Sequence, residues 1–441
     1  MRLNLFEKSF NEITIDDIRG LIGKVDEGYY VEYKSKIPEK NLKIARSIAS
    51  FANTYGGWYF LGIETDEANN AFEISGISSR ETADLIDKIR NTIKDNINPI
   101  PVFYIRSIEL DPDKSVIIVF IPDNQDAPFV TSDGKTYIRI GDSSDRIKES
   151  DRYTLDKLYE SSKEKRLKFS RFKDDQDEKS PVHNNVGFIK IYIQPYPMNS
   201  VSKFNIPMDE DVKALMEKSK NHVKIKLTES GSMSGNVPFT SGHVSFSSIK
   251  LDQSSSPITQ PRSFACEFFN DGRGKISIPL DIYEGLTFDG INSFKSSEAK
   301  TALREKFSSN SNSLLNFRLF DYGKAIASTL ILTGYYLDWL GSVEQVSGFN
   351  VAIKISNVNN FIPFFDTKEW ATHVKEFGLP IISKSNISYP EFDDFNIIGG
   401  ELSKVEDGLF TGPIYVAAIV GLMLGLPFNK FFHALESFRT T

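Results

Sequence analysis

Acidic side chains and a lysine gather in two short segments near the N-terminus. Glu27, Glu32 and Lys34 lie in the first segment, and Glu64 and Asp66 follow a neighbouring apolar segment. Grouped carboxylates can hold Mg²⁺ or Mn²⁺, which positions a water molecule and offsets the charge that develops on a phosphodiester during cleavage. A nearby lysine adds electrostatic stabilisation. We therefore predict a catalytic site made of these five residues, with the four carboxylates as metal ligands. The alternative is that they are ordinary exposed charges on an edge strand.

The same region carries basic side chains that are candidates for contacts with nucleic acid. They are Lys34, Lys36, Lys40, Lys43, Arg46 and Arg139. The net charge of −7 and the pI near 5.5 exclude a protein that coats DNA through bulk positive charge, so binding requires a local basic patch. Phosphate groups are the expected partners of such a patch. The alternative is a solvated face for the lysines and a surface salt bridge for Arg139.

Alternating residue types predict a strand over residues 29–36, which would carry part of the acidic cluster. The buried face of this strand is expected to contain Tyr29, Val31 and Tyr33. Glu32 and Lys34 are therefore expected on the exposed face. Glu27 has the wrong parity for an unbroken strand, and a turn or bulge at Gly28 would correct this.

A helix is predicted after this strand, because apolar residues recur at helical spacing between Pro38 and the pair Gly56-Gly57. We expect one of these glycines to take a left-handed conformation and Asn53 to tie the following loop. The remaining expected elements are a buried strand at 58–63, a helix at 80–93, strands at 102–109 and 115–121, a hairpin at 129–140 and a short closing helix near Leu155 and Leu158. Together they predict an α+β sandwich of one sheet and a few helices.

Four segments of this region resemble the AlbA-like domain of Schlafen proteins. They are the Glu27 to Lys34 segment with its two glutamates five residues apart, the run Ser50-Phe51-Ala52-Asn53-Thr54-Tyr55-Gly56-Gly57, the strand end Gly62-Ile63-Glu64, and Tyr137-Ile138-Arg139-Ile140-Gly141-Asp142-Ser143-Ser144. The resemblance extends over residues 25–160. It implies that any chemistry of the protein takes place in this N-terminal third.

In Schlafen nucleases, two glutamates and an aspartate form a metal-dependent site that cleaves RNA, and Glu27 and Glu32 match the two glutamates. Where the family reads Gly-Val-Asp-Asp, this chain reads Gly62-Ile63-Glu64-Thr65, so either Glu64 or Asp66 would serve as the third acid. The resemblance implies Mg²⁺ or Mn²⁺ as cofactor and RNA, including tRNA, as the favoured substrate, with single-stranded nucleic acid as the wider class. It also implies a homodimer, as in eukaryotic Schlafens, which pair two such lobes, and a role in prokaryotic defence against phage.

A second hypothesis is a regulator that binds DNA or RNA through the same domain without cleaving it. The third acid discriminates between the two. If neither Glu64 nor Asp66 can approach Glu27 and Glu32, only the binding function remains.

The chain is expected to divide into a Schlafen AlbA-like domain at residues 1–160, a charged linker at 161–182 and a sensor or regulatory region at 183–441. The fold class is α+β, with the N-terminal domain followed by a larger region of α/β type whose fold is not recognised. For that region we predict strands at 186–193 and 349–355, a hairpin at 263–279, and helices at 209–218, 297–307, 320–340 and 415–437.

Other chemistries lack their motifs. ATP binding through a P-loop is not expected, because Phe129 stands where the first glycine of a motif ending in Gly134-Lys135-Thr136 would be. The five histidines have no accompanying cysteine pairs, so zinc is not indicated. Cys266, the single cysteine, is expected to be an inert core thiol, which favours the reducing cytoplasm. The two most apolar stretches are shorter than the roughly 20 residues of a membrane helix, so no membrane partner is expected.

Overall fold

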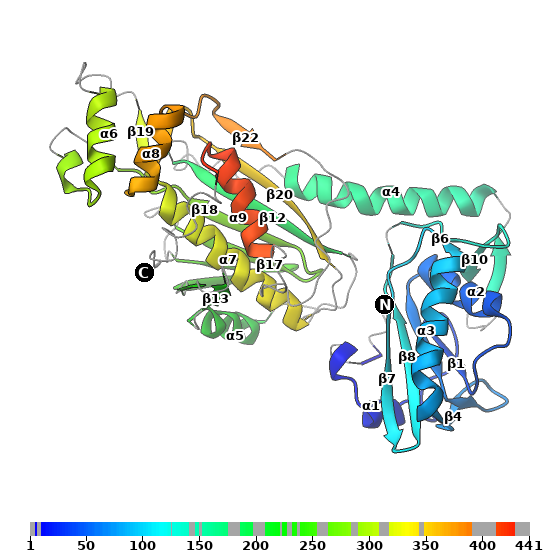
Figure 1. Ribbon diagram of the computed structural model, residues 1–441. Coiled ribbons are helices and arrows are strands. Elements are labelled where there is room, and N and C mark those ends of the chain that lie inside the picture. The colour runs from blue at the N-terminus through cyan, green and yellow to red at the C-terminus, as the bar shows by residue number, and fades with distance from the viewer. Residues whose placement is uncertain are drawn as a thin grey trace. The chain divides into compact units, whose positions relative to one another are not determined.

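The computed structural model describes residues 5–6, 10–124, 126–140, 146–149, 152–174, 186–196, 208–220, 223–226, 232–235, 239–253, 263–283, 290–307, 317–343, 348–389 and 412–427. They form two compact units. Described residues up to Phe172 make up the first, and nearly all those from Lys173 onward make up the second. Both units combine helices with strands (Figure 1), so the α+β fold class is confirmed.

The first unit contains two main sheets, a separate pair of short strands and several helices. Its helices are η1 (Phe10–Glu12), α1 (Ile15–Arg19), α2 (Asn41–Ala52), α3 (Ser79–Asn96) and α4 (Arg152–Asp174). Its strands are β1 (Val31–Lys34), β2 (Gly57–Leu61), β3 (Glu64–Thr65), β4 (Ala71–Glu73), β5 (Ile77–Ser78), β6 (Ile97–Asn98), β7 (Tyr104–Asp111), β8 (Lys114–Ile121), β9 (Val130–Thr131), β10 (Thr136–Arg139) and β11 (Arg146–Glu149). One main sheet has the order β1-β2-β8-β5, with β7 also paired to β8, and the other has the order β11-β10-β9-β6. Strands β3 and β4 pair with each other in a separate two-stranded sheet.

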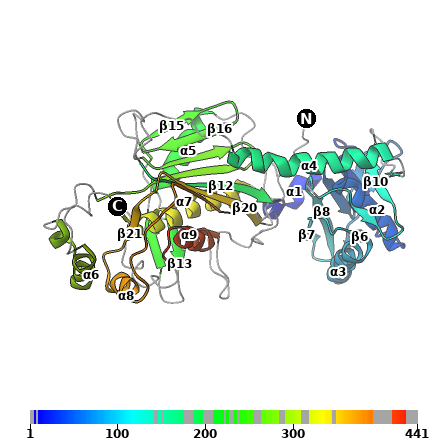
Figure 2. The same cartoon turned by 90° about the horizontal axis from the view of Figure 1, so that it is seen from above.

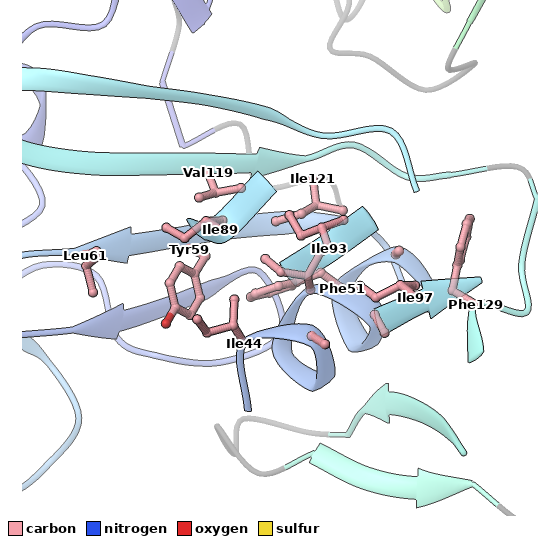
Figure 3. Packing of buried hydrophobic residues seen from close by; sticks show 14 of the residues in the cluster. Ile44, Phe51, Tyr59, Leu61, Ile89, Ile93, Ile97, Val119, Ile121 and Phe129 are labelled. Atoms are coloured by element: carbon pink, nitrogen blue, oxygen red, sulfur yellow. The ribbon is translucent and has the colours of Figure 1, made fainter. Parts of the chain in front are cut away.

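The larger of these sheets is buried on both faces. On one face, side chains of α2 and α3 pack against Tyr59, Leu61 and Val119, as Figure 3 shows. On the other face, Val31 and Tyr33 pack together with apolar residues of the N-terminal segment that includes η1 and α1. Strand β2 is accordingly buried at every position, because it lies inside the sheet and has apolar neighbours on both sides.

The end of α2 is fixed by the two residues that the sequence indicated. Asn53 donates from Nδ2 to the carbonyl oxygens of Phe129 and Tyr137, both at 2.9 Å, and its Oδ1 accepts from the Phe129 amide at 2.7 Å. Gly56 has φ +75°, and a Cβ there would lie 2.5 Å from the Ile121 carbonyl oxygen. Only glycine fits this close approach without backbone movement.

Helix α4 differs from the short closing helix that was expected. It runs from Arg152 to Asp174, so residues 161–174 of the predicted linker are helical. Residues 175–182 of that linker lie outside the described residues, and so do Gly141, Asp142, Ser143 and Ser144 of the fourth Schlafen-like segment.

The second unit is built around a seven-stranded sheet of order β15-β16-β17-β18-β12-β20-β22. The strands of the whole unit, including those outside this sheet, are β12 (Phe188–Tyr196), β13 (Val223–Lys226), β14 (Ser232–Gly235), β15 (Ser241–Val244), β16 (Ser248–Asp252), β17 (Ala265–Phe269), β18 (Gly274–Pro279), β19 (Arg318–Asp321), β20 (Gly348–Ser356), β21 (Phe361–Phe364) and β22 (Asn386–Ser388). Its helices are α5 (Asp209–Lys220), η3 (Gly290–Ser293), α6 (Ser297–Phe307), α7 (Tyr322–Val343), α8 (Lys368–Phe377) and α9 (Gly412–Met423). Residues 428–437 of the last predicted helix lie outside the described chain.

Helices α7 and α9 lie along one face of this sheet, as the two views in Figures 1 and 2 show. Phe268 of β17 packs edge-to-face on Trp339 of α7, with ring centroids 4.9 Å apart. Cys266 is fully buried on the same face, and burial raises the pKa of its thiol well above the ordinary value. A buried, protonated thiol is a poor nucleophile, which agrees with the expected inert role.

Candidate functional site

A tight turn brings the Glu27 carboxylate back over strand β1. The Gly28 amide donates to the Val31 carbonyl at 2.9 Å, and β1 starts only at Val31, so Glu27 precedes the strand as expected. Its Oε1 accepts from the Tyr33 amide at 2.7 Å and from Lys34 Nζ at 3.1 Å. Glu27 is thereby held beside the strand that carries the second glutamate.

Glu32 is buried, and the expectation of an exposed face was wrong. Only 1% of the residue is exposed, because α2 covers the face of the sheet on which Glu32 lies. Its Oε1 accepts from Ser47 Oγ at 3.0 Å, and its Oε2 lies 2.8 Å from Arg139 Nη1. Tyr29, expected on the buried face, instead lies in the turn before β1 and is half-exposed.

The partner of Glu32 is Arg139, at the end of β10. Its side chain is completely buried, its Nε donates to the Gly28 carbonyl at 2.7 Å, and its guanidinium lies 4.3 Å from the centre of the Phe51 ring. Arg139 therefore connects the turn at Gly28, strand β1 and the end of α2. A side chain in this position is not available to a phosphate group in solution, which corrects its predicted role in binding nucleic acid.

Lys34 lies between the two glutamates. Its Nζ is 3.1 Å from Glu27 Oε1 and 3.3 Å from Glu32 Oε1, and its side chain is one-third exposed. The ammonium group thus occupies the position in which a divalent cation would bridge the two carboxylates. Because these oxygens already have cationic or N–H partners, the pair does not fit the donor set of a Mg²⁺ or Mn²⁺ site.

Neither candidate for the third acid, Glu64 or Asp66, forms a metal-binding group with Glu27 and Glu32. Glu64 is exposed on β3, which pairs with β4, and Asp66 caps its own turn. Asp66 Oδ1 accepts from the amides of Asn70 at 2.8 Å and Ala68 at 2.9 Å, and the bonds from Asn70 lower the pKa of this carboxyl. Within the described residues, no three His, Cys, Asp or Glu side chains are grouped so that they could hold a metal ion. The predicted cluster of four carboxylates is therefore not formed.

Three of the predicted basic residues are exposed around the start of α2. Lys36 lies after β1, Lys40 is the residue before the first turn of α2, and Lys43 lies in that turn. The first turn of α2 contains no acidic residue, and the Lys40 side chain forms no capping hydrogen bond. The partial positive charge of the helix N-terminus therefore adds to the charge of the lysines.

Arg46 has a different environment. Its Nη2 lies 2.8 Å from Asp133 Oδ2, and its guanidinium lies over the Tyr137 ring at 5.0 Å. Burial opposes ionisation of Asp133, but hydrogen bonds from Thr131, Tyr137 and Arg46 outweigh it and lower the pKa of this carboxyl to about 2. Arg46 thus fastens α2 to the β9–β10 hairpin.

Sequence reasoning missed a group of three tyrosines. Tyr29 and Tyr30 lie in the turn before β1, and Tyr55 lies in the turn after α2. Their ring centroids are 6.2 to 6.3 Å apart in all three pairs, and Tyr55 is 61% exposed. The signal was present in the sequence, because aromatic residues next to Gly28 and Gly56 in predicted turns are expected to be at least partly exposed.

Two further expectations concern motifs outside this site. Gly134 has φ +74° in the turn between β9 and β10, so Gly134-Lys135-Thr136 belongs to a hairpin and not to the strand-to-helix loop of a P-loop. Among the described residues, no helix is both long enough and apolar enough to span a membrane.

A comparison with known protein families matches the N-terminal third of the chain. Residues 27–148 match the family model described as Schlafen, AlbA_2, so the N-terminal third contains a Schlafen AlbA-like domain, as the sequence motifs indicated. No curated protein sequence matches the chain.

Two solved structures are similar to parts of the chain. The N-terminal domain of a RecG-related protein from Nitrosomonas europaea is 19% identical, with a TM-score of 0.23, and the match covers 31% of this chain and 94% of that one. The DIP2311 protein from Corynebacterium diphtheriae is 16% identical, with a TM-score of 0.22, and the match covers 47% of this chain and 34% of that one.

Proposed function

We propose that the Schlafen AlbA-like domain at residues 27–148 binds nucleic acid without cleaving it, as a DNA- or RNA-binding regulator. The observation that carries this proposal is a difference between two groups of charged residues in the first unit. Lys36, Lys40 and Lys43 are exposed at a helix N-terminus without a side-chain cap, while Glu27 and Glu32, two of the carboxylates expected to bind metal, contact cationic side chains.

The start of α2 suits a phosphate group. The dipole of α2 places a partial positive charge at its start, which favours an anion, although the Lys43 amide already donates to the Lys40 carbonyl at 2.9 Å. Lys40 and Lys43 add two full positive charges within one turn. Contacts of this kind hold the backbone of a nucleic acid without reading its sequence.

The three tyrosines favour a single strand over a duplex. Bases of a single strand are free to stack on aromatic rings, whereas paired bases are enclosed by their neighbours. Tyr55 is the most exposed of the three rings and is expected to make the main contact. This supports RNA or single-stranded DNA as the ligand, with RNA favoured by the family resemblance.

The geometry does not support metal-dependent cleavage, which the resemblance to Schlafen nucleases implies. Lys34 occupies the position between Glu27 and Glu32, and Asp66 is engaged by Asn70. A phosphodiester site needs carboxylate oxygens that are open to a metal. The non-catalytic alternative is therefore the one that the described residues support.

The test compares two double variants of equal charge change by fluorescence anisotropy with labelled single-stranded RNA and DNA and with a duplex. Lys40→Glu/Lys43→Glu should weaken binding at least tenfold and lower the slope of log K against log salt by about 1.4 for a single strand. The control, Lys88→Glu/Lys94→Glu, changes two lysines of α3 and should bind like the wild type. Equal loss in both variants would show a general charge effect and contradict the proposal.

Two further measurements examine the ligand class and the chemistry. Tyr55→Ala should weaken binding to a single strand, whereas Tyr55→Phe should preserve it, because stacking requires the ring and not the hydroxyl. Labelled tRNA incubated with Mn²⁺ should remain intact, as it does with chelator. Cleavage that depends on Mn²⁺ and is lost in Glu27→Gln would restore the nuclease hypothesis.

We also propose that the protein acts in the cytoplasm as a homodimer. Both statements rest on the sequence, through its single cysteine and through the paired lobes of eukaryotic Schlafens. A second lobe would lengthen the track available to a nucleic acid. A purely monomeric mass by light scattering at micromolar concentration would contradict the dimer. A role in defence against phage has the same basis, and a plaque assay on cells with and without the protein tests it.

A further inference from the structure

The seven-stranded sheet of the second unit ends at strand β15, which pairs with β16 and has no strand on its other side among the described residues (Figure 2). In the hairpin that joins β15 to β16, the Ser245 amide donates to the Ser248 carbonyl at 2.8 Å. Bonded and non-bonded positions alternate along an antiparallel pair, so within β15 the odd-numbered residues bond to β16. Gly242 and Val244 therefore direct their N–H and C=O groups away from the sheet.

The edge strand of the first unit, β1, has its outward backbone groups covered by its own chain. The Val31 carbonyl accepts from the Gly28 amide at 2.9 Å. The Tyr33 amide donates to Glu27 Oε1 at 2.7 Å, and the Tyr33 carbonyl accepts from Lys34 Nζ at 2.7 Å. A turn and two side chains thus occupy the positions that a further strand would need. Covering an edge in this way prevents it from pairing with another chain.

Strand β15 has no such cover. Among the described residues, no hydrogen-bond partner lies against the outward backbone groups of Gly242 and Val244. The strand contains neither lysine nor proline, two residue types that commonly protect an edge. Val244 is 42% exposed, and Phe246, in the turn that follows, is 86% exposed. The edge thus combines open hydrogen-bonding groups with apolar side chains in contact with water.

The turn that carries Phe246 is held in place by hydrogen bonds. Ser245 Oγ accepts from the Ser248 amide at 3.0 Å and lies 2.7 Å from Ser248 Oγ. The Asn270 amide, from the neighbouring turn between β17 and β18, donates to the Ser247 carbonyl at 2.8 Å. A side chain presented by a fixed backbone loses only its own rotamer freedom when it docks. Phe246 is therefore suited to anchor a contact.

The backbone of this edge fits a second copy of the same strand. Two copies of β15 related by a twofold axis at His243 would pair Gly242 of each copy with Val244 of the other, and each such pair would exchange both N–H···O bonds. Gly242 faces α5, where a Cβ would lie 2.3 Å from Val212 Cγ1. The Val244 side chain of one copy would thus lie opposite a residue of the other copy that has no side chain.

The side chains at the edge also favour a second copy. Gly242, Val244 and Phe246 are uncharged, so they offer nothing that would select an acidic or a basic partner. In the twofold arrangement each copy removes its own Val244 and Phe246 from water, so one interface buries both residues twice. His243 would face its own copy, and Asp252 Oδ2, 3.8 Å from His243 Nε2, places a carboxylate beside this position.

We propose that β15 is the interface of a homodimer, in which the sheets of two second units join edge to edge and Val244 and Phe246 make the apolar contacts. This inference rests on the homodimer proposed above and gives that dimer an interface outside the Schlafen AlbA-like domain. The start of α2 takes no part in the pairing. Nucleic-acid binding and the interface can therefore fail independently of each other.

The first experiment measures the mass of the full chain by sedimentation and light scattering over a series of micromolar concentrations. Val244→Pro removes the outward N–H and leaves the bonds to β16 in place, and Phe246→Ser removes the exposed ring. Each should raise the dissociation constant of the dimer by about tenfold or more. The matched control is Phe72→Ser, which changes a phenylalanine of the first unit that is 62% exposed and should dimerise like the wild type.

The outcomes separate the interface from the dimer. If the wild type is a dimer and both β15 variants remain equally dimeric, the interface is wrong and the dimer stands. A monomeric wild type would mean that the edge does not pair with its own copy, and it would overturn both. Thermal unfolding of each variant confirms that the fold is retained. If Val244→Pro does not fold, Phe246→Ser and the cross-link described next decide the question.

The second experiment tests the register by cross-linking. The twofold axis puts residue 243 opposite itself with Cα atoms about 4.5 Å apart, a separation that a disulfide spans. His243→Cys should therefore give a covalent dimer on mild oxidation. Lys250→Cys is the control, since this exposed position on β16 would lie three strand spacings, about 14 Å, from its copy. Cys266 is fully buried, so the wild type should give no cross-link. A His243→Cys protein that stays uncross-linked would contradict the proposed pairing.

Discussion

The two units differ in the burial and in the pairing of their charged side chains. In the first unit, Glu32 and Arg139 are buried together, and each is the other's counterion at 2.8 Å. In the second unit, lysines of four strands share one sheet face and remain partly open to solvent. Buried opposite charges make a structural centre, whereas partly exposed charges are screened by solvent. The Glu32–Arg139 pair therefore indicates where the first unit is held together.

The largest expected effect comes from removing one member of the buried pair. Glu32→Gln keeps the size of the side chain but leaves the Arg139 guanidinium buried without its counterion, so the free energy of unfolding should fall by about 3 to 5 kcal/mol. Urea denaturation followed by tryptophan fluorescence measures this. The matched control, Glu64→Gln, changes an exposed glutamate and should alter stability by less than about 0.5 kcal/mol. Equal stability of both variants would mean that Glu32 is an ordinary surface charge.

A smaller effect is expected at the Arg46–Asp133 pair, which is intermediate between buried and exposed. The pKa of Asp133 is about 2 in the folded protein, below the value of about 3.9 in an unfolded chain. Its ionised form therefore contributes stability above pH 4, and this contribution is lost as the pH falls from 4 to 2. Asp133→Asn should cost about 1 kcal/mol at pH 6, after allowance for solvent screening, and very little at pH 2.

Denaturation curves at the two pH values check this prediction. Exposed Asp111→Asn serves as the control, because it removes a carboxylate from the first unit without breaking an ion pair among the described contacts. A stability difference between Asp133→Asn and the wild type that is the same at both pH values would contradict the low pKa of Asp133.

The smallest effect, of opposite sign, is expected at Tyr33. Its ring stacks on Phe60 with centroids 5.3 Å apart, and its buried hydroxyl has no hydrogen-bond partner among the described residues. Tyr33→Phe keeps the ring and removes the unpaired polar group, so stability should stay the same or rise by up to about 1 kcal/mol. A loss larger than that would reveal a partner for the hydroxyl.

Local patterns predicted most elements of the first unit. Strand alternation placed Val31 and Tyr33 in the core, and Asn53 and Gly56 take the roles expected at the end of α2. Each of these features depends on neighbours in the sequence. The turn at Gly28, which moves Glu27 off the strand, was predicted for the same reason.

Local patterns failed where distant segments meet. Glu32 is buried because Arg139, more than a hundred residues later, reaches it from β10 and because α2 covers the same face. The alternation of apolar and polar residues separates the two faces of a strand. It does not show whether other elements of the fold cover both faces. The role of Asp66, by contrast, depends on a near neighbour in the sequence. An aspartate followed four residues later by Asn70 is able to cap its own turn. In the second unit, the short strands β15 and β16 and helix α8 were missed.

The hydrogen bonds of Asn53 have a consequence for how the first unit opens. One side chain joins the end of α2 to Phe129, which precedes β9, and to Tyr137, which lies in β10. Opening of the hairpin would leave the buried Asn53 amide without partners, so the hairpin and the last turn of α2 are expected to open together. Amide hydrogen exchange should then give Phe129 and the end of α2 one common opening free energy. Asn53→Ala should separate the two segments, with the hairpin exchanging first.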